Sequence, residues 1–409
     1  MVPNGWEKKV FGEIVKLSKA KYNPMKSDTC LPCIELEHLA QGTGQILGSA
    51  PASSLASIKN KFQAGDVIFG KLRPYLRKYA KPTFEGVCST EIWVFDPTNK
   101  VTNPYLFQFV QTDKFISEAN KSAGSKMPRA DWGVVSEMLV PLPPIPEQQK
   151  VAKILSTWDK AISTTQCLID NSKQQKKALM QQLLSGAHKG KRLLDDSGKP
   201  FEGKWKKVKL DDVVLSTQLG TSERTKNINE SSVIPLIKMG NLTWGGFNFN
   251  KLETIPKSIV DNNLILQHGD FLFNTRNTPD LVGKSAVWKG QLTEVTFDNN
   301  INRITFDHSV NTDFICFYLT HGKGKSTINS LPAGSTSVAA IYWKDLKNIK
   351  VPLPVVSEQS KIISVLNNAD REIELLDQQL ADLKQEKKAL MQQLLTGKRR
   401  VKTNDTEAA

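Results

Sequence analysis

The chain has 409 residues, 39% of them hydrophobic, and its formal net charge is +14 with a pI near 9.4. This length predicts two or three domains with ordinary packed cores, and the basic excess favours a polyanionic partner. The sequence contains no apolar run of the ~18–20 residues that a membrane helix needs and no signal-peptide core at its start. Its five cysteines form no disulfide framework. We therefore expect a cytoplasmic protein that has no membrane partner.

One segment of the chain occurs twice, 211 residues apart. Residues 140–186 align without a gap to residues 351–397, and 22 of the 47 positions are identical. Both copies begin with VPLP, continue with EQ and end with KKALMQQLL followed by a glycine two residues on. The segments upstream diverge strongly. The repeat predicts two modules, each a variable domain followed by a nearly constant helix. Two such domains on a shared frame suit a two-sided ligand, and duplex DNA is one.

The modules can be delimited in chain order. We expect a first variable domain at 1–139, a central helical repeat at 140–186, a polar linker at 187–204, a second variable domain at 205–350, a distal helical repeat at 351–397 and a basic, flexible tail at 398–409. Both variable domains share landmarks. A QxGD turn precedes an apolar run at residues 63–66 and again at 267–270, and an AGS string followed by a tryptophan occurs at 123–125 and 333–335. The same mixed α/β scaffold is therefore predicted twice.

The repeated segments read as long helices with a heptad seam of apolar residues. Both seams carry a lysine at the same point, Lys176 and Lys387, and a polar seam residue can fix the register of two helices. A homodimeric coiled coil is one interpretation; an antiparallel pair within one chain is the favoured one. The predicted fold class is α+β. It consists of two mixed α/β domains separated and joined by two long antiparallel coiled-coil helices, with a pseudo-two-fold internal repeat.

Several short strings resemble active sites, and each lacks a required part. Residues 322–326, GKGKS, resemble a phosphate loop, but position 319 is Leu where a Walker motif needs Gly. Cys30 and Cys33 have the spacing of a zinc or redox pair, yet no second pair completes a site. The five dispersed histidines offer no metal cluster. We expect no catalytic residues and no metal site in this chain.

Basic and amide side chains in two loops are better candidates for contacts with nucleic acid. Arg and Asn can make bidentate contacts to guanine and adenine edges, while Lys and Thr mostly meet phosphates. The predicted DNA-binding residues are Lys71, Arg73, Arg77, Lys78, Lys126 and Arg129 in the first domain, and Arg276, Asn277, Lys284 and Thr336 in the second. The plain alternative is an ordinary solvated loop in each domain.

The chain resembles the specificity subunit of Type I restriction–modification systems over essentially all of its length. The resemblance rests on the paired PLPxxxEQxK…KKALMQQLL segments, on FGKLRPYLRK at 69–78 and on AGSKMPRADW at 123–132. It implies that residues 1–139 and 205–350 are target recognition domains, each reading one half of a bipartite, asymmetric site in double-stranded DNA. The helices would set the spacing between the half-sites and bind partner proteins.

The resemblance also implies the partners. Two copies of a modification (methyltransferase) subunit would bind the chain, and restriction and translocase subunits would complete the complex. S-adenosylmethionine, ATP and Mg²⁺ would belong to those partners, so that this chain would bind no cofactor. Because both helices end identically, we expect two equivalent partner-binding surfaces, formed by Lys177, Met180 and Gln181 and by Lys388, Met391 and Gln392.

Two other functions remain open from the sequence. The chain could be the recognition partner of a polypeptide in which restriction and methylation are fused, and the neighbouring genes would distinguish this case. It could also be a coiled-coil scaffold with no role on DNA, which the Arg- and Asn-bearing loops and the basic charge disfavour.

Overall fold

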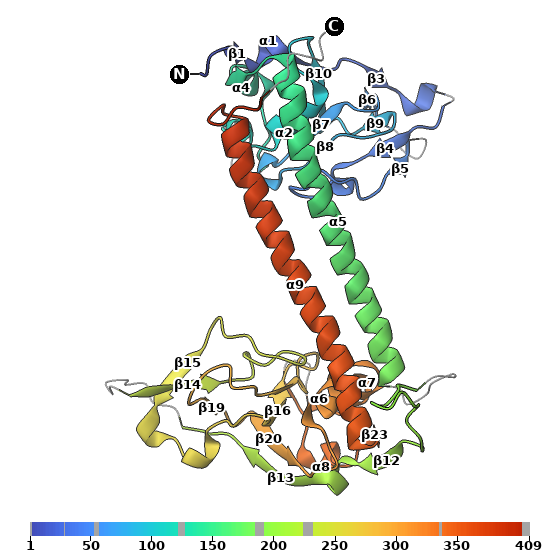
Figure 1. Ribbon diagram of the computed structural model, residues 1–409, viewed down its shortest axis with the longest axis vertical. Helices are drawn as coiled ribbons and strands as arrows, with labels where there is room; N and C mark the ends of the chain where they lie inside the picture. The colour runs from blue at the N-terminus through green and yellow to red at the C-terminus, as the bar shows by residue number, and fades with distance from the viewer. Residues whose placement is uncertain are drawn as a thin grey trace. The chain divides into compact units, whose positions relative to one another are not determined.

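The computed structural model describes residues 2–27, 29–52, 57–121, 127–184, 192–223, 232–334 and 338–402. They form two compact units: unit 1 comprises Met1–Leu168 with Leu376–Ala409, and unit 2 comprises Ile169–Leu375. Each unit contains one variable domain and a part of both repeated segments (Figure 1). The boundaries of the units thus lie within the long helices, whereas the sequence placed the domain boundaries at the helix ends.

In its described part, unit 1 combines two sheets, a two-stranded ribbon and short helices. One sheet has the order β2 (Val15–Leu17), β10 (Ile92–Pro97), β7 (Val67–Gly70), β8 (Tyr79–Ala80). The other has the order β3 (Lys21–Tyr22), β6 (Lys59–Phe62), β9 (Gly86–Cys88), β4 (Pro32–Ile34), β5 (Ala50–Pro51). Strand β1 (Glu7–Val10) pairs antiparallel with β11 (Leu139–Leu142). The helices are α1 (Phe11–Ile14), α2 (Asn103–Val110), α3 (Asp113–Asn120) and α4 (Trp132–Ser136).

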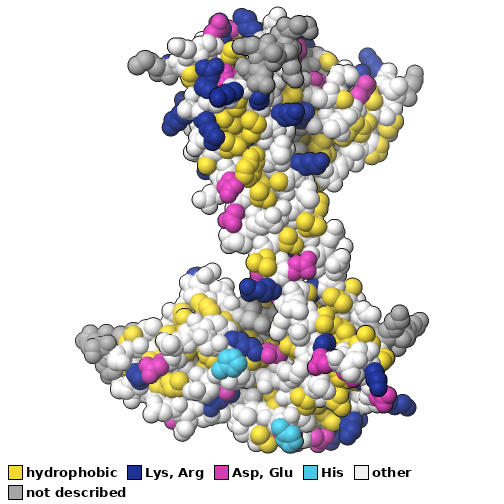
Figure 2. All heavy atoms as spheres, viewed as in Figure 1, with side chains coloured by type: hydrophobic (Ala, Val, Ile, Leu, Met, Phe, Trp, Pro, Cys, Tyr) yellow, Lys and Arg dark blue, Asp and Glu magenta, His cyan; other side chains and the backbone are white. Residues whose placement is uncertain are grey.

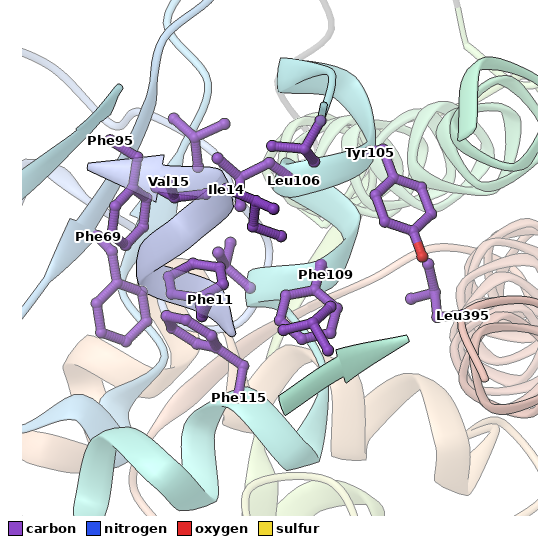
Figure 3. Packing of buried hydrophobic residues seen from close by; sticks show 14 of the residues in the cluster. Phe11, Ile14, Val15, Phe69, Phe95, Tyr105, Leu106, Phe109, Phe115 and Leu395 are labelled. Atoms are coloured by element: carbon purple, nitrogen blue, oxygen red, sulfur yellow. The ribbon is translucent and has the colours of Figure 1, made fainter. Parts of the chain in front are cut away.

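An aromatic core joins these elements in unit 1. Phe11 is fully buried, and its ring centroid lies 5.6 Å from that of Phe115 and 6.0 Å from that of Phe109. Phe69 and Phe95 approach this group from the four-stranded sheet (Figure 3). Edge-to-face and offset pairs of this kind stabilise a core beyond the apolar area that they bury. The core therefore fixes β7, and with it the basic loop that follows.

Unit 2 repeats the plan with different strands added. Its main sheet has the order β13 (Val214–Leu219), β20 (Ile301–Phe306), β16 (Phe271–Asn274), β18 (Ser285–Val287). Two three-stranded sheets follow the orders β15 (Glu253–Pro256), β14 (Val233–Ile237), β19 (Thr296–Phe297) and β17 (Arg276–Asn277), β22 (Ala339–Ala340), β21 (Ala333–Gly334). Strand β12 (Lys206–Lys209) pairs with β23 (Lys350–Leu353). The helices are α6 (Thr312–Thr320), α7 (Gly322–Asn329) and α8 (Trp343–Leu346).

The QxGD landmarks form the same turn in both units, as the sequence predicts. The Asp66 carboxylate accepts a hydrogen bond from the Gln63 N–H at 2.8 Å, and Asp270 does the same for Gln267 at 2.8 Å. The intervening glycines have φ values of 91° and 95°, a conformation that residues with a Cβ rarely adopt. Each turn leads directly into a buried strand, β7 or β16.

Two long helices cross from one unit into the other. Helix α5 extends over Ile145–Leu183 and α9 over Val356–Leu394, 39 residues each. The two seam lysines are used alike: Lys387 Nζ lies 2.5 Å from Asp159 Oδ1 in unit 1, and Lys176 forms an ion pair with Asp370 in unit 2. No helix within the described ranges is long and apolar enough to cross a membrane.

The Glu–Gln pair that begins each long helix is almost fully buried. In unit 1, Gln148 accepts a hydrogen bond from the N–H of Thr102, the N-cap of α2, and donates to the carbonyls of Lys100 and Pro143. Gln359 in unit 2 makes the same three bonds, to the N–H of Asn311 and to the carbonyls of Ser309 and Pro354. Since Asn311 is the N-cap of α6, each glutamine attaches a domain helix to a long helix.

The neighbouring glutamates bind an arginine from the segment that follows the other long helix. Glu147 accepts two bonds from Arg400, at 2.7 and 2.8 Å, and one from the Trp6 indole at 2.9 Å. Glu358 accepts two bonds from Arg192. Bidentate pairs of this kind are the stronger class of charge-assisted hydrogen bond. The exposed fraction of each glutamate side chain is 3%, so that without its arginine each carboxylate would lack its countercharge.

These contacts correct the prediction of a flexible tail from residue 398. Gly397 ends the last helical turn with φ 74°, Arg400 binds Glu147, and Val401 packs against the core of unit 1. Residues 398–402 therefore belong to the folded unit, because a buried carboxylate requires their arginine. Residues 403–409, and the predicted helix-ending glycine at 186, lie outside the described residues.

Replacing Arg400 by alanine should lower the free energy of unfolding by about 2 kcal/mol, because Glu147 would stay buried without its charged partner. Denaturant unfolding of the purified chain measures this loss. Arg399→Ala is the matched control, since Arg399 is exposed and only its backbone N–H forms a bond, to the Gln393 carbonyl. Equal stabilities of the two variants would contradict a structural role for the Glu147–Arg400 pair.

Candidate nucleic-acid interface

The basic loop of unit 1 follows β7 and bends around a short helical turn at Pro74–Leu76. Arg73 and Arg77 flank this turn with φ values of 52° and 51°. A left-handed conformation costs a residue with a Cβ roughly 1–2 kcal/mol, and strain of this kind is concentrated at functional sites. Arg73 is exposed, and its backbone N–H donates to the Pro128 carbonyl at 2.7 Å. The loop thus presents the Arg73 side chain at a conformational cost.

The two later cations of this loop contact their own domain. Arg77 forms an ion pair with Asp113 at the start of α3, which lowers the pKa of that carboxyl, and nearby Lys388 acts in the same direction. Lys78 donates from Nζ to the Leu36 carbonyl. The sequence predicted Arg77 as a DNA-binding residue; the structure places its guanidinium against Asp113 of α3. A DNA contact by Arg77 or Lys78 stays a prediction that these bonds do not favour.

Lys71, Arg73 and Arg129 lie together at the end of β7. The Lys71 N–H donates to the Glu91 carbonyl, and the Lys71 carbonyl accepts from the Ala130 N–H. Arg129 Nε lies 3.0 Å from Glu91 Oε2. Since the Arg129 side chain is 53% exposed, this ion pair is worth little in water and leaves the guanidinium accessible. The predicted site residue Lys126 lies outside the described residues.

Unit 2 builds the same loop from other residues. The Thr275 N–H donates to the Asn300 carbonyl, and the Thr275 carbonyl accepts from the Ile341 N–H, as at Lys71 in unit 1. Arg276 and Asn277 form β17, pairing with β22, and Arg276 is exposed. The half-buried Lys284 occupies the position of Lys78, since its carbonyl accepts from the Asn274 N–H. Thr336 lies outside the described residues.

Beside Arg276 is a cleft of about 510 Å³ that sequence reasoning did not find. Strands β13 and β20 and the start of α8 line it, and its polar lining includes Asn299, Asn300 and Asn302. The triplet of asparagines within four positions was visible in the sequence. What was not visible is that β20 places the last of them at the cleft, because this depends on strand register.

A second cavity, of about 460 Å³, lies in unit 1 between the basic loop, α2, α3 and the two long helices. Three predicted partner-binding residues, Lys388, Met391 and Gln392, line it. Figure 2 shows Lys and Arg side chains gathered around exposed apolar side chains on one face of this unit. The corresponding residues of unit 2, Lys177, Met180 and Gln181, lie on the last turns of α5; Lys177 and Gln181 are exposed, and Met180 packs against the core.

The strings that resemble active sites occupy structural positions. Residues 322–329 form α7. Cys33 is buried, which raises the pKa of its thiol to about 11, and Cys30 is exposed. Among the described residues, no three or more His, Cys, Asp or Glu side chains are grouped so that they could hold a metal ion.

The comparison with protein families gives a match over most of the chain. The model of the Type I restriction modification DNA specificity domain matches residues 3–171 and 202–385. The Type I restriction enzyme MjaVIII specificity subunit of Methanocaldococcus jannaschii is 26% identical over 430 aligned residues, which cover 98% of this chain and 94% of that protein. The Type I restriction enzyme EcoDI specificity subunit of Escherichia coli is 26% identical over 192 residues, 46% of this chain and 43% of that protein.

Solved structures share the fold. A chain from work on complex assembly and conformational transition of the type I R-M system superimposes with a TM-score of 0.61 at 21% identity, covering 98% of this chain and all of that one. A Type-I restriction-modification system S subunit from M. genitalium superimposes with a TM-score of 0.55 at 12% identity, covering 97% and 98%.

Arg73→Gly should raise the free energy of unfolding by about 0.5 kcal/mol, because glycine adopts a positive φ without strain, while weakening binding to duplex DNA at low salt. Arg73→Ala keeps the strain and should lose the same affinity without the gain in stability. Thermal unfolding and fluorescence anisotropy with a labelled duplex separate the two effects. Unchanged DNA affinity in both variants would remove Arg73 from the interface.

Proposed function

The chain belongs to the Type I restriction modification DNA specificity family, and on that premise we propose that it reads a bipartite, asymmetric site in double-stranded DNA without catalysing a reaction itself. As a Type I specificity subunit, it serves DNA sequence recognition. In the proposal, residues 1–139 and 205–350 each read one half-site, and base pairs of any sequence separate the two. The cleavage and methylation chemistry belongs to partner subunits, which would supply S-adenosylmethionine, ATP and Mg²⁺.

One observation carries this proposal: a single loop scaffold is built twice and filled with different side chains. The backbone bonds at Lys71 and at Thr275 are equivalent. The exposed arginines at this loop, however, are Arg73 and Arg129 in unit 1 and Arg276 in unit 2. Because side chains at base edges decide which sequence is read, the same scaffold with different side chains predicts two different half-sites and hence a non-palindromic target.

The long helices suit a spacing role in this proposal. In unit 1, Glu147 of α5 bonds Arg400, just beyond the end of α9, and Asp159 of α5 bonds Lys387 of α9. In unit 2, Ser172 bonds Glu372 and Lys176 bonds Asp370. The residue numbers thus rise along α5 as they fall along the other segment. This order supports an antiparallel pair. The pairs Asp159–Lys387 and Asp370–Lys176 are related by the 211-residue repeat, which supports a pseudo-two-fold axis. At ~1.5 Å per residue, each helix is a rod of about 58 Å that would fix the distance between half-sites.

The ends of the helices are the proposed binding sites for two modification subunits. In unit 1 the cavity lined by Lys388, Met391 and Gln392 offers apolar surface edged by cations. The KKALMQQLL string is identical in both helices, and identical surfaces suit two copies of one partner. Restriction and translocase subunits would join the complex thus formed.

Methylation mapping of genomic DNA, with this gene intact and deleted, tests the function. We expect a methylated two-part motif that disappears on deletion, and the motif itself would give both half-sites and the spacer. Arg276→Ala should then reduce methylation by altering one half-site only, with the partner subunits still bound. An unchanged methylome in cells that express the partners would refute a role in modification.

Met391→Glu should weaken assembly with the modification subunit by about tenfold or more, since it buries a charge in the cavity. Analytical ultracentrifugation of the mixed subunits measures this loss. Gln393→Glu, an exposed residue that does not line the cavity, is the matched control. Equal assembly of both variants would place the partner elsewhere on the chain.

A further inference from the structure

At the cleft of unit 2 is a buried hydrogen-bond acceptor that none of the described protein groups satisfies. Asn302 lies on β20 and lines the cleft, and its exposed fraction is 5%. Its Oδ1 atom finds no hydrogen-bond partner among the residues that the structure describes. A buried polar atom left without a partner costs roughly 1–3 kcal/mol. Such an atom, on a side chain that lines a cleft, is a feature that a ligand with a donor would explain.

The register of the strands identifies the residue of unit 1 that occupies the same place. In unit 2, Asn302 is opposite Phe273 on β16. In unit 1, Trp93 is opposite Phe69 on β7. Phe69 and Phe273 are equivalent, because the next residue in each strand donates its N–H to the carbonyl of an equivalent lysine, Lys78 or Lys284. Asn302 thus stands where unit 1 has an indole.

In unit 1 an indole and an ion pair stand at the positions equivalent to the cleft residues. Trp93 is 7% exposed, and its ring centroid lies 5.7 Å from that of Trp132, the first residue of α4. Arg129 and Glu91, at two of the other equivalent positions, form their ion pair. In unit 2, Trp343 begins α8 in the same way, but Asn302, Ala340 and Asn300 replace the three other side chains. The lining therefore differs between the two recognition domains in its side chains and in one strand. Strand β13 extends far enough to pair Leu219 with Asn302, whereas the pairing of β2 with β10 in unit 1 ends at Phe95.

We propose that this cleft of the second recognition domain takes the edge of one base of its half-site, with Asn302 Oδ1 accepting a hydrogen bond from the exocyclic amino group of an adenine or a cytosine. This assignment rests on the proposed DNA-reading function and adds a specificity-determining residue to it.

The chemistry of the lining fits such an edge. Adenine N6 and cytosine N4 are the amino donors that bases present in the major groove, and asparagine is a usual partner of adenine. Arg276 and Asn299 are exposed at the cleft, where a guanidinium meets the phosphate backbone or a neighbouring guanine. Tyr342 and Trp343 add aromatic surface against which a base can stack. Base and phosphate contacts would thus be made from one side of the domain.

Two substitutions of Asn302 that keep the side-chain volume similar distinguish the effect of the acceptor atom from the effect of side-chain volume. Asn302→Leu removes the acceptor, and Asn302→Asp retains one. The complex with the modification subunits would first select its site from a randomised duplex library. Each adenine of the second domain's half-site would then be replaced by purine, and each cytosine by 2-pyrimidinone, analogues that lack the amino group.

We expect the wild-type complex to bind about tenfold more weakly when the amino group is missing at one position. The Asn302→Leu complex should bind the natural base and its analogue equally well at that position, with its preferences at every other position unchanged. The Asn302→Asp complex should still bind the natural base more tightly than the analogue. Asn250→Leu, an exposed asparagine of the same domain that does not line the cleft, should behave as the wild type. Whether the sensitive position holds adenine or cytosine identifies the base.

Three results would overturn the proposal: full discrimination in Asn302→Leu, loss of the whole half-site in both Asn302 variants, or no sensitivity of the wild type to the analogues. Unchanged recognition of the first domain's half-site shows that a variant has folded and assembled correctly. Failure of the underlying DNA-reading function would look different, because the wild-type complex would then select no two-part sequence at all.

Discussion

A buried glutamate at the start of each long helix is the constraint on which the rest of the structure depends. Glu147 and Glu358 are each held by an arginine that arrives from the end of the other helix. A carboxylate buried at this depth requires a countercharge. In each unit, the segment that follows one long helix must therefore fold against the start of the other. The adjoining glutamines, fully buried, attach a domain helix to the same point through three bonds each.

This arrangement explains why the repeated segments stay alike while the domains differ. The residues that join domain, helix and returning segment have to satisfy several buried polar groups at once, and few side chains do so. The seam lysines add a second condition, since Lys387 is 7% exposed and bonds both Asp159 and Gln111. Residues at the ends of the domain strands do not have to satisfy these buried polar groups, so they can be substituted without disturbing the contacts between domain and long helices.

The loops that follow β7 and β16 show how such exchange produces different surfaces. Their backbones make equivalent bonds, yet Trp93 and the Glu91–Arg129 ion pair of unit 1 correspond to Asn302, Asn300 and Ala340 at the cleft of unit 2. Different side chains at equivalent strand positions, together with a longer β13, thus change the volume and polarity of the surface beside each loop.

The two modules, the long helices, the shared turns and the family could be predicted from the sequence, because a repeat, a heptad seam and a glycine-dependent turn are local patterns that a linear chain displays directly. The exposure of Arg73 and Arg276 was predicted too, although Arg276 lies in β17 and not in a loop. The bonds of Arg77 and Lys78 within their own domain, the place of Arg400 in the fold and the position of Asn302 at a cleft could not be predicted. The first three depend on partners distant in the chain, at Asp113, Leu36 and Glu147, and the last depends on a strand register that residue order alone does not specify.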